Sequence, residues 1–119
     1  MAWSFKPGIP VYLQVADILC YNIVSGKYPP GTQIPAVRQL AVEAAINPNT
    51  VQHAFMELEK RGVIETRGTL GRFVTEDTSL IEESRRKHAQ SIVTNFLKTI
   101  EHIGYSKEEI LEMIKEEFK

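Results

Sequence analysis

The sequence has 119 residues, which is enough for one domain or for one small domain with an appendage. Its composition, with 43% hydrophobic and 24% charged residues, is that of an ordinary soluble globular protein, and no apolar run approaches the roughly 18 residues that a membrane span needs. The net charge of −1 does not favour a nucleic-acid binder, but it does not exclude one, because acidic residues gather in the tail after Glu76.

Apolar residues recur at helical spacing from Val11 to Ser25, which predicts an amphipathic helix that ends at Gly26. Cys20 lies within this helix. As a lone thiol it is interpreted as a packing residue, since one cysteine permits no internal disulfide. The single cysteine, and a start without signal-peptide features, lead us to expect a cytoplasmic protein.

Two further helices are predicted before residue 62. The first is short, follows Pro35 and ends before Ile46. The second begins at Asn47, which can cap a helix, and Pro48 suits the first turn because its missing N–H is no loss there. Gly62 is expected to end this helix after about Arg61.

After Gly62 the spacing of the apolar residues changes from that of a helix to that of short strands. Residues 63–66 and 72–75 are β-like, and the glycine-containing stretch 67–71 between them predicts a hairpin tip. Helix, short helix, turn, helix and hairpin is the order of a winged helix-turn-helix. We therefore predict a mainly α (α+β) fold with a winged helix-turn-helix DNA-binding domain at residues 1–76.

The helical pattern returns after Asp77, with a long helix that Gly104 breaks and a last helix that opens with a capping box at Ser106. Two such helices cannot bury their apolar faces alone, so residues 77–119 are predicted to form a two-helix dimerisation and effector tail. The alternative is that the tail packs onto its own DNA-binding domain. The expected dimer interface consists of Ile92, Val93, Phe96, Leu97, Ile100 and Ile103.

Several segments between Pro10 and Thr75 carry a family resemblance. They include Pro10-Val11-Tyr12-Leu13-Gln14-Val15, Val37-Arg38-Gln39-Leu40-Ala41, Asn47-Pro48-Asn49-Thr50-Val51 and Leu58-Glu59-Lys60-Arg61-Gly62. Together they resemble the N-terminal domain of the GntR family of regulators, and the short tail resembles its YtrA-type branch. The resemblance implies a transcriptional regulator, commonly a repressor of its own operon. Two residues depart from the family: Ala36 replaces a small hydroxyl residue, and Ala45 replaces a common glycine.

Polar side chains occupy the first turns of the third helix, where a recognition helix reads the major groove. They are Asn47, Asn49, Thr50, Gln52 and His53. Gln52 is suited to a bidentate contact with adenine, and Thr50 to a phosphate or a base edge. The alternative is a solvated helix face.

Arg38 lies in the first turn of the second helix, and in the resembling family the arginine here reaches DNA, often at guanine. A guanidinium fork matches the guanine O6 and N7 acceptors. The alternative is a surface arginine paired with Glu43. At the hairpin, Arg67, Gly68, Thr69 and Arg72 resemble the family's minor-groove element, against the alternative of a plain turn.

The expected partners are double-stranded DNA, read at a (pseudo)palindromic operator, and a second copy of the chain. A small-molecule effector, if one exists, would have to bind through the tail, where we hypothesise a small pocket at Phe96 and Tyr105. No metal, cofactor or enzymatic activity is expected, because the three histidines lack metal-ligand spacing and no catalytic arrangement is present. The alternative function is a winged-helix protein–protein interaction module with a degenerate DNA face.

Overall fold

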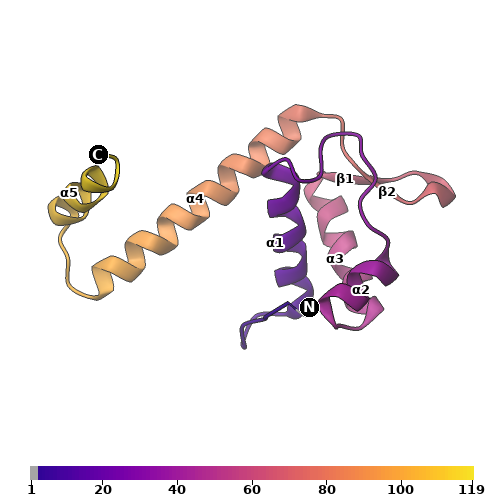
Figure 1. The fold of residues 1–119 in the computed structure, drawn as a ribbon, viewed down its shortest axis with the longest axis horizontal. Helices are drawn as coiled ribbons and strands as arrows, with labels where there is room; N and C mark the ends of the chain where they lie inside the picture. Colours follow the sequence, from indigo (N-terminus) through magenta and orange to yellow (C-terminus); the bar gives the residue numbers. More distant parts are fainter. Residues whose placement is uncertain (1–2) are drawn as a thin grey trace. The chain divides into compact units, whose positions relative to one another are not determined.

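The computed structural model describes residues 3–119 and is mainly helical, with one small antiparallel hairpin (Figure 1). Its elements are α1 (Val11–Val24), α2 (Val37–Ala44), α3 (Pro48–Arg61), β1 (Ile64–Thr66), the 3-10 helix η1 (Gly68–Leu70), β2 (Arg72–Val74), α4 (Thr78–His102) and α5 (Lys107–Glu117). They form two compact units, of which the first ends at Arg85 and the second is Arg86–Lys119. The order of elements confirms the predicted winged helix-turn-helix followed by two helices.

The core of the first unit lies between α1, α2, α3 and the hairpin. Leu19 from α1, Leu40 from α2 and Phe55 from α3 are each no more than 1% exposed. Burying an aliphatic or aromatic side chain of this size contributes roughly 1.5–3 kcal/mol. Ile81, near the start of α4, is also buried in this core. The first turns of α4 therefore belong to the first unit, and the functional division between residues 76 and 77 stays a prediction.

The start and the end of α3 follow from local chemistry, as predicted. The side chain of Asn47 accepts a hydrogen bond of 2.8 Å from the backbone N–H of Asn49, and Pro48 occupies the first helical position. Gly62 ends the helix with φ 82°, a left-handed conformation that costs glycine little.

Both departures from the family pattern lie at the ends of α2. Ala36 occupies the N-cap position and supplies no side-chain hydrogen bond to the helix. Ala45 ends the helix with φ 58° and ψ 48°, and among the described residues it is the one non-glycine residue with positive φ. An L-residue in this conformation carries roughly 1–2 kcal/mol of strain. The chain therefore adopts a left-handed conformation where the family commonly has glycine, and Ala45 is strained there.

The hairpin pairs β1 with β2 in antiparallel register, with Ile64 opposite Val74 and Thr66 opposite Arg72. Its tip is the 3-10 turn η1, a detail beyond the simple tip that we predicted. Gln33 adds a bridge to Phe73 from the outer side, and its amide donates to the Leu70 carbonyl at 2.6 Å. Gly71 has φ 113°, a conformation that L side chains rarely adopt, and a Cβ there would lie 2.7 Å from the amide nitrogen of Gln33, whose side chain would have to move.

Cys20 is 3% exposed and packs in the core, with its Sγ 3.7 Å from the Oγ of Ser84. This burial confirms that Cys20 is a packing residue. Among residues 3–119, none of the helices is long and apolar enough to cross a membrane.

The second unit contains the remainder of α4 and all of α5. Ser106 caps α5 with a capping box: its hydroxyl accepts from the Glu109 backbone N–H, and the Glu109 carboxylate accepts from the Ser106 backbone N–H. Ile110 is buried at 2% exposure, whereas Leu111 and Phe118 are exposed.

Candidate nucleic-acid interface

The first turns of α3 expose most of the polar side chains that were predicted to read DNA. Asn47, Asn49, Gln52 and His53 are exposed, and Thr50 is half-buried. Asn47 uses its side-chain oxygen to cap the helix, so its amide NH2 is the part left for DNA. The N-terminal end of α3 also carries no acidic residue in its first turn, which leaves the positive end of the helix dipole open to a phosphate.

Arg38 lies in the first turn of α2, where its side chain is exposed. The alternative pairing with Glu43 is not seen: within the described part of the chain, the Arg38 guanidinium has no hydrogen-bond or ion-pair partner. The first turn of α2 has no acidic residue either. An exposed guanidinium at a positive helix end can donate to a guanine edge or a phosphate.

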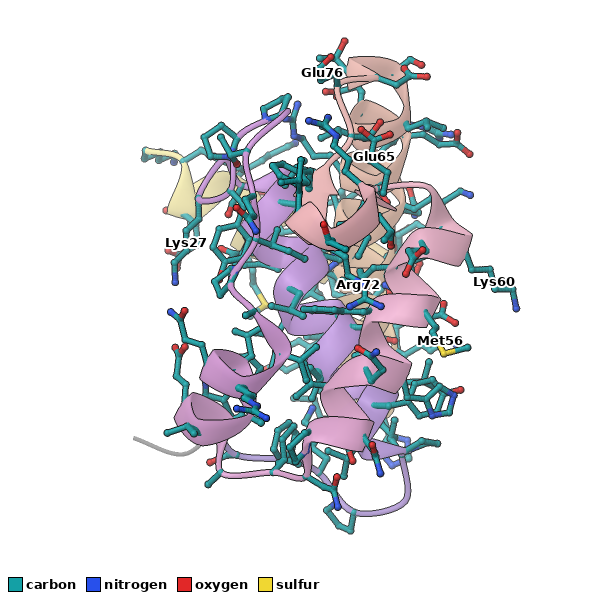
Figure 2. All side chains as sticks on the ribbon, turned by 90° about the vertical axis from the view of Figure 1, so that its right-hand side faces the viewer. Lys27, Met56, Lys60, Glu65, Arg72 and Glu76 are labelled. Carbon is teal, nitrogen blue, oxygen red and sulfur yellow. The ribbon has the colours of Figure 1, made fainter. Side chains whose placement is uncertain are left out.

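Gln52 is joined to the hairpin by Arg72. The Nη1 of Arg72 donates to the Oε1 of Gln52 at 3.1 Å, while its Nε donates to the Oε1 of Glu59 at 3.3 Å. The guanidinium also lies over the ring of buried Phe55, with its Cζ 4.8 Å from the ring centroid. Figure 2 shows the Arg72 side chain reaching toward α3. The structure thus places the Arg72 side chain between the hairpin and α3. The sequence analysis had instead assigned Arg72 to a hairpin element that enters a minor groove.

His53 is stacked on Tyr12, which lies on α1. The ring centroids are 3.6 Å apart and the planes are inclined by 6°. The two rings line a shallow hollow of ≈ 230 Å³ together with Met56, Glu57 and Lys60, and Figure 2 shows Met56 and Lys60 on the outer side of α3. Tyr12 was not among the predicted interface residues, and only the tertiary packing of α1 on α3 reveals its contact with His53.

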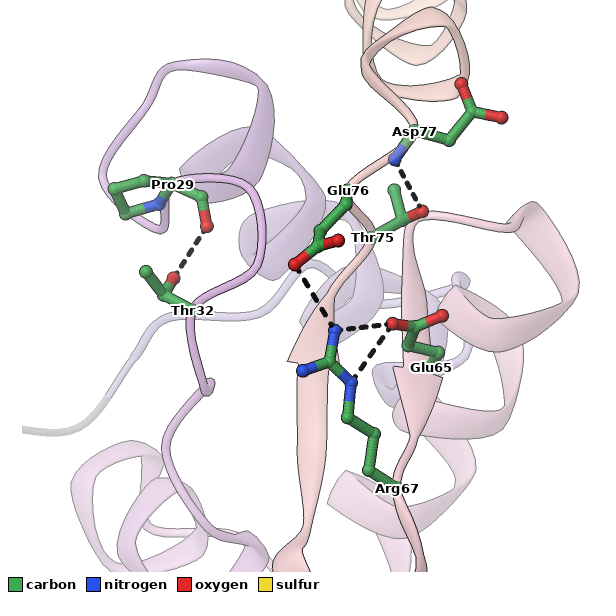
Figure 3. Close-up of polar contacts among 7 residues, drawn as sticks. All are labelled: Pro29, Thr32, Glu65, Arg67, Thr75, Glu76 and Asp77. Atoms are coloured by element: carbon green, nitrogen blue, oxygen red, sulfur yellow. Dashed lines mark hydrogen bonds and ion pairs between the residues drawn. The ribbon is translucent and has the colours of Figure 1, made fainter.

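Arg67 at the end of the hairpin is held by two carboxylates in the free protein (Figure 3). Its Nη2 lies 2.7 Å from the Oε1 of Glu65 and 3.9 Å from the Oε1 of Glu76. The guanidinium also stacks over Phe73, with Cζ 4.4 Å from the ring centroid. These contacts use the Nε and Nη2 of Arg67 and leave its Nη1 without a carboxylate partner among the described residues.

Gly68 and Thr69 form the exposed tip of the hairpin. The turn is closed by two backbone hydrogen bonds of 2.9 Å, from Leu70 N–H to the Arg67 carbonyl and from Arg67 N–H to the Gly71 carbonyl. A tip with small side chains allows close approach of its backbone to DNA.

The second unit presents the predicted apolar row on α4. Ile92, Val93, Phe96 and Leu97 are 36–56% exposed, and Ile100 is half-buried. Ile103 follows the last residue of α4, His102, and is 69% exposed. Tyr105 is exposed as well. An exposed row of this kind is typical of a surface that binds another protein.

Comparison with known proteins gives consistent results. Residues 11–74 match the sequence profile of the family described as "Bacterial regulatory proteins, gntR family". The chain is 37% identical to the HTH-type transcriptional regulator YhcF of Bacillus subtilis, over 94% of this chain and 93% of that protein. It is 32% identical to the HTH-type transcriptional repressor YtrA of the same organism, over 93% and 86% of the two chains. Its structure is similar to that of a GntR family transcriptional regulator from Listeria monocytogenes, with TM-score 0.83, 33% identity and coverage of 94% and 98%.

Proposed function

Because the chain belongs to the GntR family of bacterial regulatory proteins, in its YtrA-like branch, we propose that it represses transcription as a homodimer on a (pseudo)palindromic operator. Members of this family are non-enzymatic, DNA-binding transcriptional regulators, and so is this chain. The observation that carries the DNA-binding part of this proposal is the exposed guanidinium of Arg38 in the first turn of α2, together with the polar, exposed N-terminal turns of α3. These groups supply hydrogen-bond donors for the acceptor atoms of base edges and phosphates.

The proposed homodimer forms through the apolar row on α4. Burial of an exposed row by a second copy removes apolar surface from water, and a two-fold dimer is the commonest arrangement of identical chains. Each DNA-binding unit has few basic side chains that could bind phosphates, so one unit alone should bind DNA weakly, and dimerisation would compensate for this. Two half-sites about 34–36 Å apart, bound together, raise the affinity by roughly 10²–10⁴ over one half-site.

The repressor assignment is supported by the similarity to YtrA of Bacillus subtilis, an HTH-type transcriptional repressor. A reporter gene placed behind the chain's own promoter tests the sign of regulation. We expect expression to rise when Arg38→Ala protein replaces the wild type. A fall in expression would identify an activator. An effector, if one exists, would act through the tail, where Phe96 and Tyr105 are exposed aromatic groups.

Sequence-specific DNA binding is tested by fluorescence anisotropy, using the DNA upstream of the chain's own gene and a shuffled duplex. Arg38→Ala is expected to weaken binding to the upstream DNA by roughly 1–3 kcal/mol, with little change on the shuffled duplex. Arg86→Ala is the matched control, because Arg86 is an exposed arginine in the second unit. Equal, weak binding to both duplexes that Arg38→Ala leaves unchanged would contradict the proposal.

The dimer is tested by sedimentation. Phe96→Glu places a charge in the apolar row and is expected to yield monomers. Ser91→Glu is the control, since Ser91 is exposed and lies about 140° around the same helix from Phe96. Dimers that persist in Phe96→Glu would show that another surface joins the two chains.

A further inference from the structure

Arg72 is anchored at three points before any DNA is bound. Glu59 accepts from its Nε, the ring of Phe55 lies beneath its guanidinium, and β2 fixes its backbone opposite Thr66. Glu59 is itself held, because its second carboxylate oxygen accepts from the Thr66 hydroxyl at 3.1 Å. The Arg72 side chain is only 20% exposed. An arginine held in this way has little freedom to leave α3 and reach into a groove.

The fourth contact of Arg72 determines how the Gln52 amide is oriented. A guanidinium can only donate hydrogen bonds, so the amide oxygen of Gln52, and not its nitrogen, must face Arg72. The amide nitrogen is then the end of Gln52 that remains without this partner. The carboxamide of an exposed glutamine would otherwise turn freely between two orientations.

We propose that Arg72 sets the base preference of Gln52: by holding the amide oxygen, it presents the amide NH2 to DNA and selects guanine over adenine at the base pair that Gln52 contacts. Arg72 is thus a positioning residue that acts through Gln52. This inference rests on the proposed function, since it specifies how the same recognition helix reads its operator.

The chemistry of the base edges supports guanine. A bidentate glutamine–adenine contact needs the amide oxygen to accept from the adenine N6 amino group while the NH2 donates to N7. Here the oxygen already accepts from a cation, and the positive charge of Arg72 opposes the approach of a second donor. Guanine presents O6 and N7, both acceptors, to the free NH2. The result differs from the adenine contact suggested by the sequence alone.

The test is selection from a library of randomised DNA duplexes by the full-length chain and three variants. Gln52→Ala first identifies the base pair that Gln52 reads, as the position in each half-site where discrimination is lost. Arg72→Leu retains apolar contact with Phe55 but has no donor for Gln52. Arg67→Leu is the matched control, because Arg67 is the other hairpin arginine and its contacts are with Glu65, Glu76 and Phe73.

We expect the wild type to favour guanine over adenine at this position by about fivefold or more, which is the lower end of a specific base contact. In Arg72→Leu the ratio should fall to about one or reverse, while Arg67→Leu weakens binding and leaves the ratio unchanged. The guanine-to-adenine ratio is counted in the DNA that is recovered with the protein. Partial unfolding of a variant reduces the amount of DNA recovered but does not alter this ratio.

Three outcomes would overturn the inference: adenine selected by the wild type, an unchanged ratio in Arg72→Leu, or no position that depends on Gln52. Each still leaves a selected operator and therefore the proposed function. If the wild type enriches no sequence at all, the proposed function itself fails, and the inference falls with it.

Discussion

Tyr12 on α1 holds the imidazole of His53 on α3 in a near-parallel stack, so that one helix sets the plane of a side chain that the other helix exposes to solvent. The stack leaves the two ring nitrogens of His53 at the edge of the ring, where they are able to form hydrogen bonds. Aromatic pairs of this kind contribute roughly 0.5–1.5 kcal/mol beyond the area that they bury.

This relationship predicts different effects for two substitutions of Tyr12. Tyr12→Phe keeps the ring and should leave operator affinity within about twofold of the wild type. Tyr12→Ala releases His53 and should weaken operator binding by about twofold to tenfold, as expected from the loss of roughly 0.5–1.5 kcal/mol of stacking. Anisotropy titration measures both. Equal affinities for the two variants would show that the stack does not prepare His53 for DNA.

Substitutions of Asn47 and Asn49 should distinguish the stability of α3 from its recognition of DNA. Asn47→Ala removes the cap and should lower the free energy of unfolding by about 1 kcal/mol, together with operator affinity. Asn49 takes part in the cap through its backbone N–H, so Asn49→Ala should lower operator affinity while the urea midpoint stays unchanged. A destabilised Asn49→Ala protein would contradict this division of roles.

Ala45→Gly should stabilise the protein. Glycine relieves roughly 1–2 kcal/mol of left-handed strain, and the greater freedom of glycine in the unfolded chain offsets about 0.4–1 kcal/mol of that gain. The expected net increase in the free energy of unfolding is up to about 1.6 kcal/mol, measured in urea. Ala44→Gly is the control: Ala44 is buried within α2, so its substitution should destabilise. A loss of stability in Ala45→Gly would show that the strain is compensated elsewhere.

The capping box of α5 predicts a local dependence on pH. Hydrogen bonds from the Ser106 backbone N–H, and then from the Ser106 hydroxyl, lower the pKa of Glu109 below its ordinary value of 4.5. A carboxylate whose pKa is lowered by folding stabilises the helix above that ordinary value, and this stabilisation is lost as the pH falls through the lowered pKa. Amide hydrogen exchange in the first turn of α5 should therefore quicken on acidification below pH 4.5, after correction for the intrinsic rate.

Glu109→Gln is the control for this dependence, because glutamine has no carboxylate to titrate. The variant should show little pH-dependent change in protection of the same amides. If its protection falls with pH as steeply as that of the wild type, another group governs the start of α5.

The sequence predicts the helix boundaries well because the signals for them are local. Asn47, Pro48, Gly62 and Ser106 each act within a few residues, through a side-chain cap, a fixed φ or a left-handed turn. Their effect on the backbone does not depend on the rest of the fold.

The contacts of the predicted interface residues depend on tertiary structure and could not be predicted in this way. Arg72 is 20 residues from Gln52 and 13 from Glu59, and it meets both only because the hairpin folds back along α3. The position of Gln33 beside the hairpin and that of Tyr12 beside His53 have the same origin. Residue type and spacing identify candidates for DNA contact, whereas the partner that each candidate has in the free protein is a property of the packed unit.

Cys20 offers a built-in probe of motion in the first unit. Its thiol is nearly inaccessible and faces Ser84 of α4, so an alkylating reagent can modify it only when this part of the unit opens. The rate of alkylation in native buffer thus reports how often the first turns of α4 separate from α1, without any engineered label. Comparing that rate with and without operator DNA would show whether DNA binding tightens the attachment of α4.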